Sequence, residues 1–308
     1  MGKSGLKVSA VGLGCNNFAI KCNAEQTKAI VNRALDEGVT LFDTADIYGN
    51  RGGSEELLGK ALGKRRCEVV VASKFGMSMG EGPYLHGASR RYVMAAAEDS
   101  LRRLNTDYID LYQLHTPDAD TPQEETLEAL ADLVHAGKVR YLGCSNFAAW
   151  QLAEALGISR ARGLPAYISA QNEYSLLERQ IDRELLPACR HFGVGILPFF
   201  PLASGFLTGK YRRGAELPKG TRMALMERIA TRTLTEPNFD LLEKLENFAR
   251  ERGHTLLELA VGWLVSEPQN SSVICGATTP EQVSQNVKAG EWRLSAEERE
   301  AVDKLTRR

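Results

Sequence analysis

Short β-branched runs recur along this chain, and each ends on a polar residue. Runs of this kind are typical of buried parallel strands. They are separated by about 25 to 40 residues, which leaves room for one helix and two loops, so each run begins a β/α unit. Because the carboxyl ends of such strands point to one face of a barrel, we expect the terminal polar residues to meet there. These residues are Asp43, Lys74, His115, Ser145, Asn146 and Gln171.

Eight runs in this rhythm predict an α/β fold, a (β/α)8 TIM barrel, with residues 1–308 as one domain. Before the first strand, residues 6–14 predict a short N-terminal hairpin across the barrel floor. After the seventh strand, expected at 194–199, the Gly-, Arg- and Pro-rich stretch 205–238 breaks the rhythm and predicts a long loop insertion. Residues 295–305 predict an added C-terminal helix with a capping sequence at its start.

The composition argues against several classes of protein. A net charge of −1 provides no basic surface for nucleic acid or for an anionic membrane. No apolar run approaches the ~20 residues that cross a bilayer. The first residues lack the apolar core of a secretory signal, so we expect a cytoplasmic protein. The six cysteines include no CxxC pair and no zinc-ligand spacing, so we predict no metal site and reduced, structural thiols.

The segment 42–49 is the sharpest local motif, because Tyr48 follows the strand-ending Asp43 by five residues and both can face one mouth. A lysine ammonium such as Lys74 should stabilise the phenolate and lower the tyrosine pKa from its usual value of about 10. Asp43 would keep that lysine charged, and His115 would hold a carbonyl oxygen. Such a set is a general acid for an oxygen that becomes an alkoxide, which suits carbonyl reduction by hydride.

Each of these residues also has an ordinary structural interpretation. Asp43 could cap a loop, Lys74 could be a solvated strand end, and His115 could be a satisfied rim histidine. Their joint occurrence on successive strand ends favours a site, because lysine rarely lies beside a buried apolar strand without a partner.

Taken together, these segments resemble the aldo-keto reductase family, over almost the whole chain from Gly12 to about Asn286. The resemblance implies that Tyr48 is the proton donor, that Asp43 and Lys74 tune it, and that His115 orients the substrate carbonyl. It also implies NADP (NADPH) as the cofactor and a small-molecule carbonyl compound as the substrate. The segments that carry it are FDTADIYG (42–49), VASK (71–74), DLYQLH (110–115) and GCSNF (143–147).

No GxGxxG motif follows the first strand, so a Rossmann dinucleotide site is not expected. The resemblance instead implies amide contacts to the nicotinamide and Phe199 beneath its ring. Lys210 would run along the pyrophosphate and Arg222 would be a second cationic contact. The start of the helix after strand eight would hold the 2′-phosphate and adenine. The full set of expected cofactor contacts is Gly14, Cys15, Asn16, Asp43, Ser145, Asn146, Gln171, Phe199, Leu202, Gly205, Lys210, Arg222, Gly276, Thr278, Gln282, Gln285 and Asn286.

Two departures from the family pattern bear on specificity. Many members have Lys or Arg for the 2′-phosphate in the segment where this chain has Gly276, Thr278 and Gln282. These residues resemble those of the potassium-channel β-subunit branch. Because the cation is missing, NAD stays the alternative to NADP. Asn16 and Asn17 make the first loop polar, which favours a small neutral or sugar-like substrate.

Three functions are open. The first is an NADP-dependent reductase of aldehydes or ketones. The second is an NADPH-binding redox sensor or regulatory subunit with slow residual reductase activity, but a sensor has no need of a complete proton-donating set. The third is a barrel hydrolase or lyase, for which Asp43 and Asp46 are the only close acid pair and no histidine pair accompanies them. No nucleic-acid or membrane partner is expected, and the oligomeric state is open.

Overall fold

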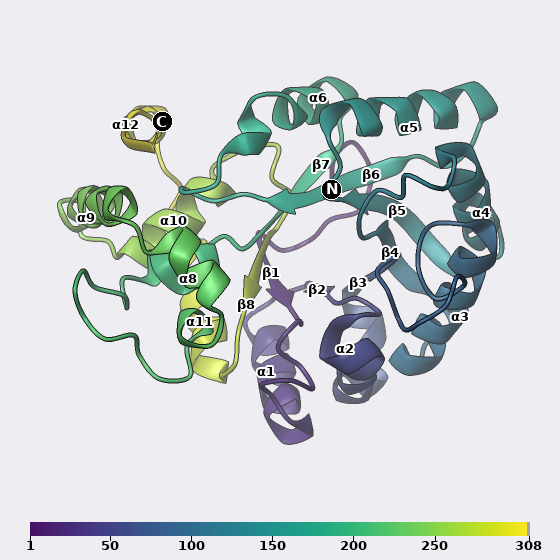
Figure 1. Cartoon of the computed structure of the whole chain (residues 1–308), viewed down its shortest axis with the longest axis horizontal. Helices are drawn as coiled ribbons and strands as arrows, with labels where there is room; N and C mark the ends of the chain where they lie inside the picture. The colour runs from purple at the N-terminus through teal and green to yellow at the C-terminus, as the bar shows by residue number, and fades with distance from the viewer. Residues whose placement is uncertain (307–308) are drawn as a thin grey trace.

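Eight parallel strands form the centre of the molecule in the computed structural model, which describes residues 1–306. Their hydrogen-bonded order is β7-β6-β5-β4-β3-β2-β1-β8, so the last strand lies beside the first (Figure 1). This arrangement confirms the (β/α)8 barrel. The strands are β1 Val11–Gly14, β2 Leu41–Asp43, β3 Val70–Phe75, β4 Ile109–Leu114, β5 Val139–Ser145, β6 Tyr167–Glu173, β7 Gly195–Phe199 and β8 Val273–Gly276.

Helices surround the strands (Figure 1), and several begin at capping residues. Ser89 accepts a hydrogen bond from the backbone N of Tyr92, and Thr255 forms a capping box with Glu258, which satisfies N–H groups that the helix leaves free. Helices α1 Ala24–Asp36, α2 Tyr48–Leu62, α3 Arg90–Leu104, α4 Gln123–His135, α5 Ala149–Arg162 and α6 Leu185–Phe192 follow the first six strands, and α9 Glu236–Arg250, α10 Leu256–Val265, α11 Pro280–Ala289 and α12 Ala296–Thr306 complete the chain.

The barrel interior has its own small apolar core, separate from the larger layer between strands and helices. Side chains alternate across a strand, so a residue two positions beyond an inner-core residue also faces the interior. Three polar residues occupy such positions: Asp43, Lys74 and Gln113. The alternation therefore puts a charged pair and an amide at the carboxyl end of the barrel, above an apolar floor. The inner core consists of Leu41, Val70, Ala72, Leu111, Leu197 and Ile274.

The ring closes differently between β7 and β8 than elsewhere. Here the backbone N of Ile196 donates to the O of Gln269, and the N of Ser271 donates to the O of Ile196, both at 2.8 Å. These partners precede β8, and only an isolated bridge joins Ile196 to Asn270. The barrel therefore has a seam, made by β7 and residues 269–271, where two bonds replace a regular ladder.

The N-terminal hairpin predicted over residues 6–14 does not form. Residues 11–14 are β1 itself, which pairs with β2 and β8, and residues 1–10 contain no strand. Met1, Leu6 and Val8 of this segment pack against the inner core without a hairpin. The preceding segment is instead fixed by reciprocal bonds between Ser9 and Thr40, in which each backbone N donates to the other's hydroxyl oxygen.

The insertion after β7 is present but is less irregular than the sequence suggests. It contains the 3₁₀ segment η3 Ala203–Thr208 and two short helices, α7 Arg222–Leu225 and α8 Glu227–Thr233, before α9 begins. Helices this short show little periodicity in a sequence, which is why the composition alone indicates a loop.

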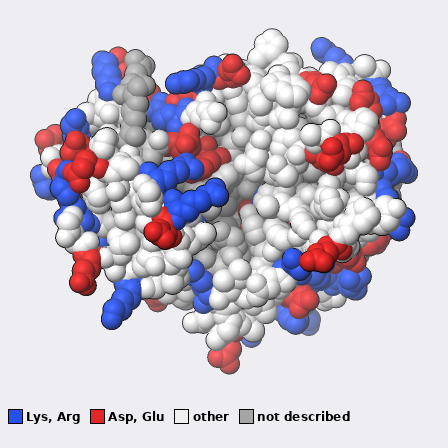
Figure 2. Space-filling model, viewed as in Figure 1, with Lys and Arg blue, Asp and Glu red and all other residues white. Residues whose placement is uncertain are grey.

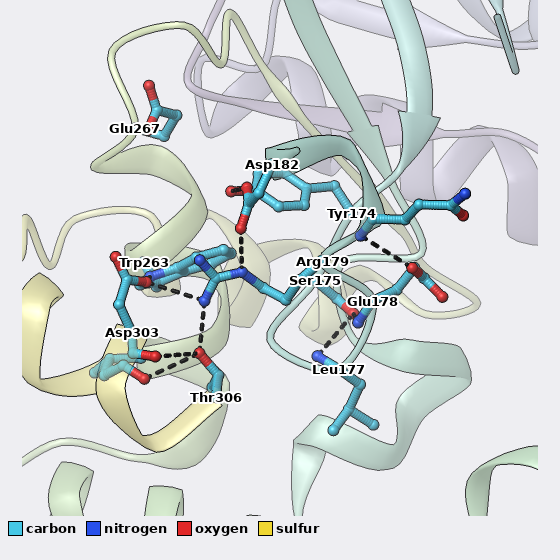
Figure 3. A network of polar contacts seen from close by, with 12 residues as sticks. Tyr174, Ser175, Leu177, Glu178, Arg179, Asp182, Trp263, Glu267, Asp303 and Thr306 are labelled. Carbon is cyan, nitrogen blue, oxygen red and sulfur yellow. Dashed lines mark hydrogen bonds and ion pairs between the residues drawn. The ribbon is translucent and has the colours of Figure 1, made fainter. Parts of the chain in front are cut away.

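The predicted C-terminal helix is confirmed as α12, and a polar network attaches it to the barrel (Figure 3). Arg179, in the connection after β6, donates to Asp182 at 2.6 Å and to Asp303 of α12 at 3.0 Å. Its guanidinium lies 4.5 Å from the ring of Trp263 in α10, and the indole Nε1 donates to the same Asp303. One arginine thus joins three segments that are distant in sequence.

The interpretation of residues 1–308 as one domain stays a prediction, and residues 307 and 308 lie outside the described part of the chain. Within residues 1–306, no helix combines the length and hydropathy needed to cross a membrane. All six cysteines are free thiols.

Candidate active site

A buried lysine and an aspartate form the centre of the site. The Nζ of Lys74, a residue that is 0% exposed, donates to Oδ2 of Asp43 at 2.7 Å and to the backbone O of Thr44 at 2.9 Å. Oδ1 of Asp43 accepts from the side-chain amides of Gln171 at 2.8 Å and Gln113 at 3.3 Å. Both carboxylate oxygens therefore have partners, as a buried charge requires.

Gln113 is a member of this cluster that sequence reasoning missed, since that reasoning names only His115 at the end of β4. The alternation of a strand places Gln113 on the inner face with Leu111. A polar residue at an inward position of an apolar strand is the signal that identifies it.

A tight turn at the start of α2 holds Tyr48 beside the ion pair. Gly49 has a φ of +68°, and a Cβ at this position would lie 2.3 Å from the backbone N of Ser54, so only glycine fits. The Nζ of Lys74 is 5.0 Å from the centre of the Tyr48 ring. The phenol is half-buried and lines the cavity described below.

One expectation about this tyrosine is wrong. Lys74 was expected to lower the pKa of Tyr48 below its usual value, but burial of the phenol outweighs the lysine charge and raises that pKa. Burial also acts to lower the pKa of Lys74, yet the Asp43 charge and the contact with Tyr48 outweigh it, so this pKa is raised as well. At neutral pH the tyrosine therefore keeps its proton and the lysine its charge.

His115 contributes a neutral imidazole. Burial, and then the charge of Lys74, lowers the pKa of His115 to about 3. Its ring meets the Tyr48 ring edge-on at 5.7 Å between centres, and its Nδ1 has no hydrogen-bond partner within residues 1–306. The side-chain amide of Asn146 donates to the His115 backbone O at 2.9 Å, which fixes the end of β4. A neutral imidazole can donate one hydrogen bond to a ligand oxygen.

A cavity of about 1230 Å³ lies over Tyr48 and His115, and the space-filling view shows a hollow near the centre of this face (Figure 2). This volume exceeds the usual range for a drug-sized ligand and leaves room for a dinucleotide. Every residue expected to contact the cofactor lines it, whereas Lys74 lies behind Asp43 and does not reach the surface. The lining includes Gly14, Cys15, Asn16, Asp43, Ser145, Asn146, Gln171, Phe199, Leu202, Gly205, Lys210, Arg222, Gly276, Thr278, Gln282, Gln285 and Asn286.

Several lining residues were not among the individually expected contacts, although Pro201, Ser204, Thr208, Gly220 and Thr221 lie in segments that the family resemblance places along the pyrophosphate. Most belong to the insertion after β7 or to the start of α10, and their positions depend on how the insertion folds back over the barrel, which no local pattern indicates. They are Lys21, Pro201, Ser204, Thr208, Lys219, Gly220, Thr221, Leu225, Thr255, Leu257, Glu258, Ile274 and Lys288.

The donor set of the cavity fits a nicotinamide dinucleotide. Side-chain amides and a hydroxyl from β5 and β6 face one part of it, the start of α11 forms another wall, and Lys210 and Arg222 have no carboxylate partner within residues 1–306. Unpaired cations and a helix start are the groups that bind phosphates.

A metal-dependent or two-carboxylate site finds less support. Residues 1–306 contain no group of three or more His, Cys, Asp or Glu side chains that could hold a metal ion. Asp46 does not line the cavity; it is buried beside Tyr92, whose hydroxyl lies 3.4 Å from its Oδ2.

Comparison with known proteins points in the same direction. The sequence profile of the Aldo/keto reductase family matches residues 10–307. The chain is 39% identical to a probable voltage-gated potassium channel subunit beta of Arabidopsis thaliana, over 94% of this chain and 89% of the relative. It is 37% identical to L-glyceraldehyde 3-phosphate reductase of Escherichia coli (strain K12), over 94% and 86%. It is 33% identical to versiconal hemiacetal acetate reductase of Aspergillus parasiticus, over 97% and 93%.

Proposed function

The chain belongs to the aldo/keto reductase family, and from that premise we propose that it is an NADP-dependent oxidoreductase that reduces an aldehyde or ketone to an alcohol, with Tyr48 as the proton donor. The observation that carries the proposal is the position of Tyr48 at the cavity surface, between the buried Asp43–Lys74 pair and the neutral His115. NADP over NAD, and a cytoplasmic location, are parts of the same proposal.

The residues would share the work as follows. Bound NADPH supplies a hydride to the carbonyl carbon. Ser145, Asn146 and Gln171 would hold the carboxamide of the nicotinamide, and Phe199 would pack against its ring, so that one ring face meets the substrate.

Tyr48 would bind the carbonyl oxygen and protonate it as negative charge develops there. Its raised pKa keeps the proton on the phenol at neutral pH, and an alkoxide is a far stronger base than a phenolate, so transfer stays favourable. Lys74 then stabilises the phenolate, and Asp43 compensates the buried lysine charge before and after the transfer. The imidazole of His115 would donate a second hydrogen bond to the same oxygen.

The test is NADPH oxidation with a panel of aldehydes and ketones, followed by Tyr48→Phe. The variant keeps the ring and loses only the proton, so turnover should fall by about 10² to 10⁴-fold while NADPH affinity is unchanged. A variant that kept its rate would refute the role of Tyr48.

A second candidate is an NADPH-binding redox sensor or regulatory subunit. It is supported by the relatives named as potassium channel β subunits. Tight NADPH binding with no turnover of any carbonyl compound would favour it over the reductase.

A further inference from the structure

Two glutamine side chains meet at one oxygen of the Asp43 carboxylate and also contact each other. Nε2 of Gln171 donates to Oδ1 of Asp43 at 2.8 Å, and Nε2 of Gln113 donates to the same oxygen at 3.3 Å. Nε2 of Gln171 also donates to Oε1 of Gln113 at 3.4 Å. Three side chains, from β2, β4 and β6, therefore form a closed triangle of hydrogen bonds.

The Asp43 carboxylate determines which way each amide points. Its Oδ2 accepts from the ammonium of Lys74, and an ionised carboxylate only accepts hydrogen bonds. Each glutamine must therefore turn its NH2 group towards Oδ1. This leaves Oε1 of Gln113 as the acceptor for the second N–H of Gln171, so both N–H groups of Gln171 are used.

The oxygen of the Gln171 amide is left for the cavity. Within residues 1–306 this Oε1 accepts no hydrogen bond, and it is not fully buried, so it is open to the cavity that Gln171 lines. With the Asp43 bond alone, the amide could still rotate over a broad range about its last side-chain torsion. The contact with Gln113 restricts that rotation and keeps an acceptor facing the cavity.

The surroundings of Gln113 leave room for this arrangement. Gln113 is 0% exposed, and Gly143 of the neighbouring strand β5 lies against it. A Cβ at Gly143 would lie 3.0 Å from Cγ of Gln113 and 2.5 Å from Oγ of Ser169, so a side chain there would displace one of the two. Because Gln113 has partners at both its nitrogen and its oxygen, its own amide is held in one orientation.

We propose that Gln113 is a positioning residue that joins the proton-donating cluster to the nicotinamide, by holding the Gln171 amide with its oxygen towards the cavity. An amide oxygen accepts from an N–H group, and the carboxamide NH2 of nicotinamide is such a donor. The inference rests on the proposed function, in which Gln171 binds the carboxamide. It adds a residue that does not itself line the cavity.

The experiment compares the natural dinucleotide, NADP or NAD, with its acetylpyridine analogue, in which a methyl group replaces the carboxamide NH2. Affinities are measured by protein fluorescence for the parent, Gln113→Met and Ser169→Ala. Methionine has nearly the length of glutamine and no strong hydrogen-bonding group. Ser169→Ala is the matched control, because this buried hydroxyl borders the same glycine and has no hydrogen-bond partner within residues 1–306.

Gln113→Met should weaken binding of the natural dinucleotide about three- to tenfold, as expected for one neutral hydrogen bond, and should leave the affinity for the analogue unchanged. The parent should bind the natural dinucleotide more tightly than the analogue, and Ser169→Ala should match the parent with both. In a Gln171→Met background, the change at Gln113 should have no further effect. If Gln113→Met does not fold, Gln113→Asn, whose amide is one methylene shorter, should show the same pattern.

Three results would overturn the proposal. Equal weakening of both ligands would show that Gln113 only supports the fold, and unchanged affinity for the natural dinucleotide would show that Gln171 is oriented without it. Equal affinity of the parent for the two ligands would show that no N–H of the carboxamide is recognised. A protein that gives the expected binding pattern but reduces no carbonyl compound would count against the reductase alone.

Discussion

Two polar networks in this molecule have similar bond lengths and different surroundings. The Asp43–Lys74 pair lies inside the barrel, with side chains that are 4% and 0% exposed. The Arg179 network joins the connection after β6 to α12 (Figure 3). Its ion-paired side chains are between 21% and 26% exposed. The Asp43–Lys74 pair contacts the cavity through Asp43 and Tyr48, whereas no residue of the Arg179 network lines the cavity.

The comparison teaches that burial, and not the ion pair itself, makes a charge useful for chemistry. In water the charge of a lysine beside a phenol is screened by solvent and salt. In the barrel interior the charge of Lys74 is screened less and acts on the proton of Tyr48, although burial of the phenol outweighs it. The Arg179 network is partly exposed and attaches α12. It also acts on a neighbouring group, because burial and then the charge of Asp182 raise the pKa of the Tyr174 phenol, but none of its residues lines the cavity. Four measurements test this contrast.

Lys74→Met should produce the largest effect. It leaves the Asp43 carboxylate buried without a cation, so the free energy of unfolding should fall by about 3–5 kcal/mol and turnover should be lost. Chemical denaturation and NADPH oxidation measure the two quantities. The double variant Asp43→Asn/Lys74→Met should recover stability without activity. A single variant as stable as the parent would contradict the account of the buried pair.

Arg179→Met should lower the stability by less than Lys74→Met and should leave turnover unchanged. It removes charged hydrogen bonds to Asp182 and Asp303 but leaves both carboxylates in reach of water, so we expect a loss of about 2–3 kcal/mol of unfolding free energy. Turnover at a temperature well below the midpoint of unfolding should match that of the parent. A lowered kcat in the folded variant would show that α12 influences the site.

The pH dependence of stability should also separate the two regions. Because the pKa of His115 falls to about 3 on folding, the unfolded chain binds a proton that the native state does not between about pH 6.5 and pH 3. Stability should therefore decrease as the pH falls through this window, by up to ~1.4 kcal/mol per pH unit. His115→Gln should flatten this slope and Arg179→Met should not. An identical slope in the His115 variant would contradict the buried neutral imidazole.

Ionic strength should give the smallest difference. Raising salt from 0.1 M to 1 M shortens the screening length to about 3 Å, which weakens partly exposed pairs and leaves buried ones unchanged. The stability difference between the parent and Arg179→Met should shrink by less than about 1 kcal/mol, and that between the parent and Lys74→Met should stay constant. If salt changed the stability losses of Arg179→Met and Lys74→Met equally, the contrast between the partly exposed and the buried ion pair would be wrong.

The sequence predicts those features that follow from a local residue pattern together with the parallel order of the strands. The β/α rhythm predicts the barrel, and the strand ends predict that Asp43, Lys74 and His115 come together. It could not predict the missing hairpin, because the segment before β1 is fixed by contacts of Ser9 with Thr40, which is distant in sequence. Nor could it predict the direction of the Tyr48 pKa shift, since that depends on how deeply the phenol is buried relative to the lysine charge.

The seam between β7 and residues 269–271 should determine where the native barrel opens locally. A barrel whose strands are joined by full hydrogen-bond ladders except at one seam should open locally at that seam first. Phe199 of β7 and Ile274 of β8, on the two sides of the seam, both line the cavity. A ligand that contacts both sides of the seam would stabilise it against local opening. We therefore expect the amide hydrogens of Ile196 and Ser271 to exchange with solvent sooner than those of β3 and β4, and to slow most when the cavity is filled.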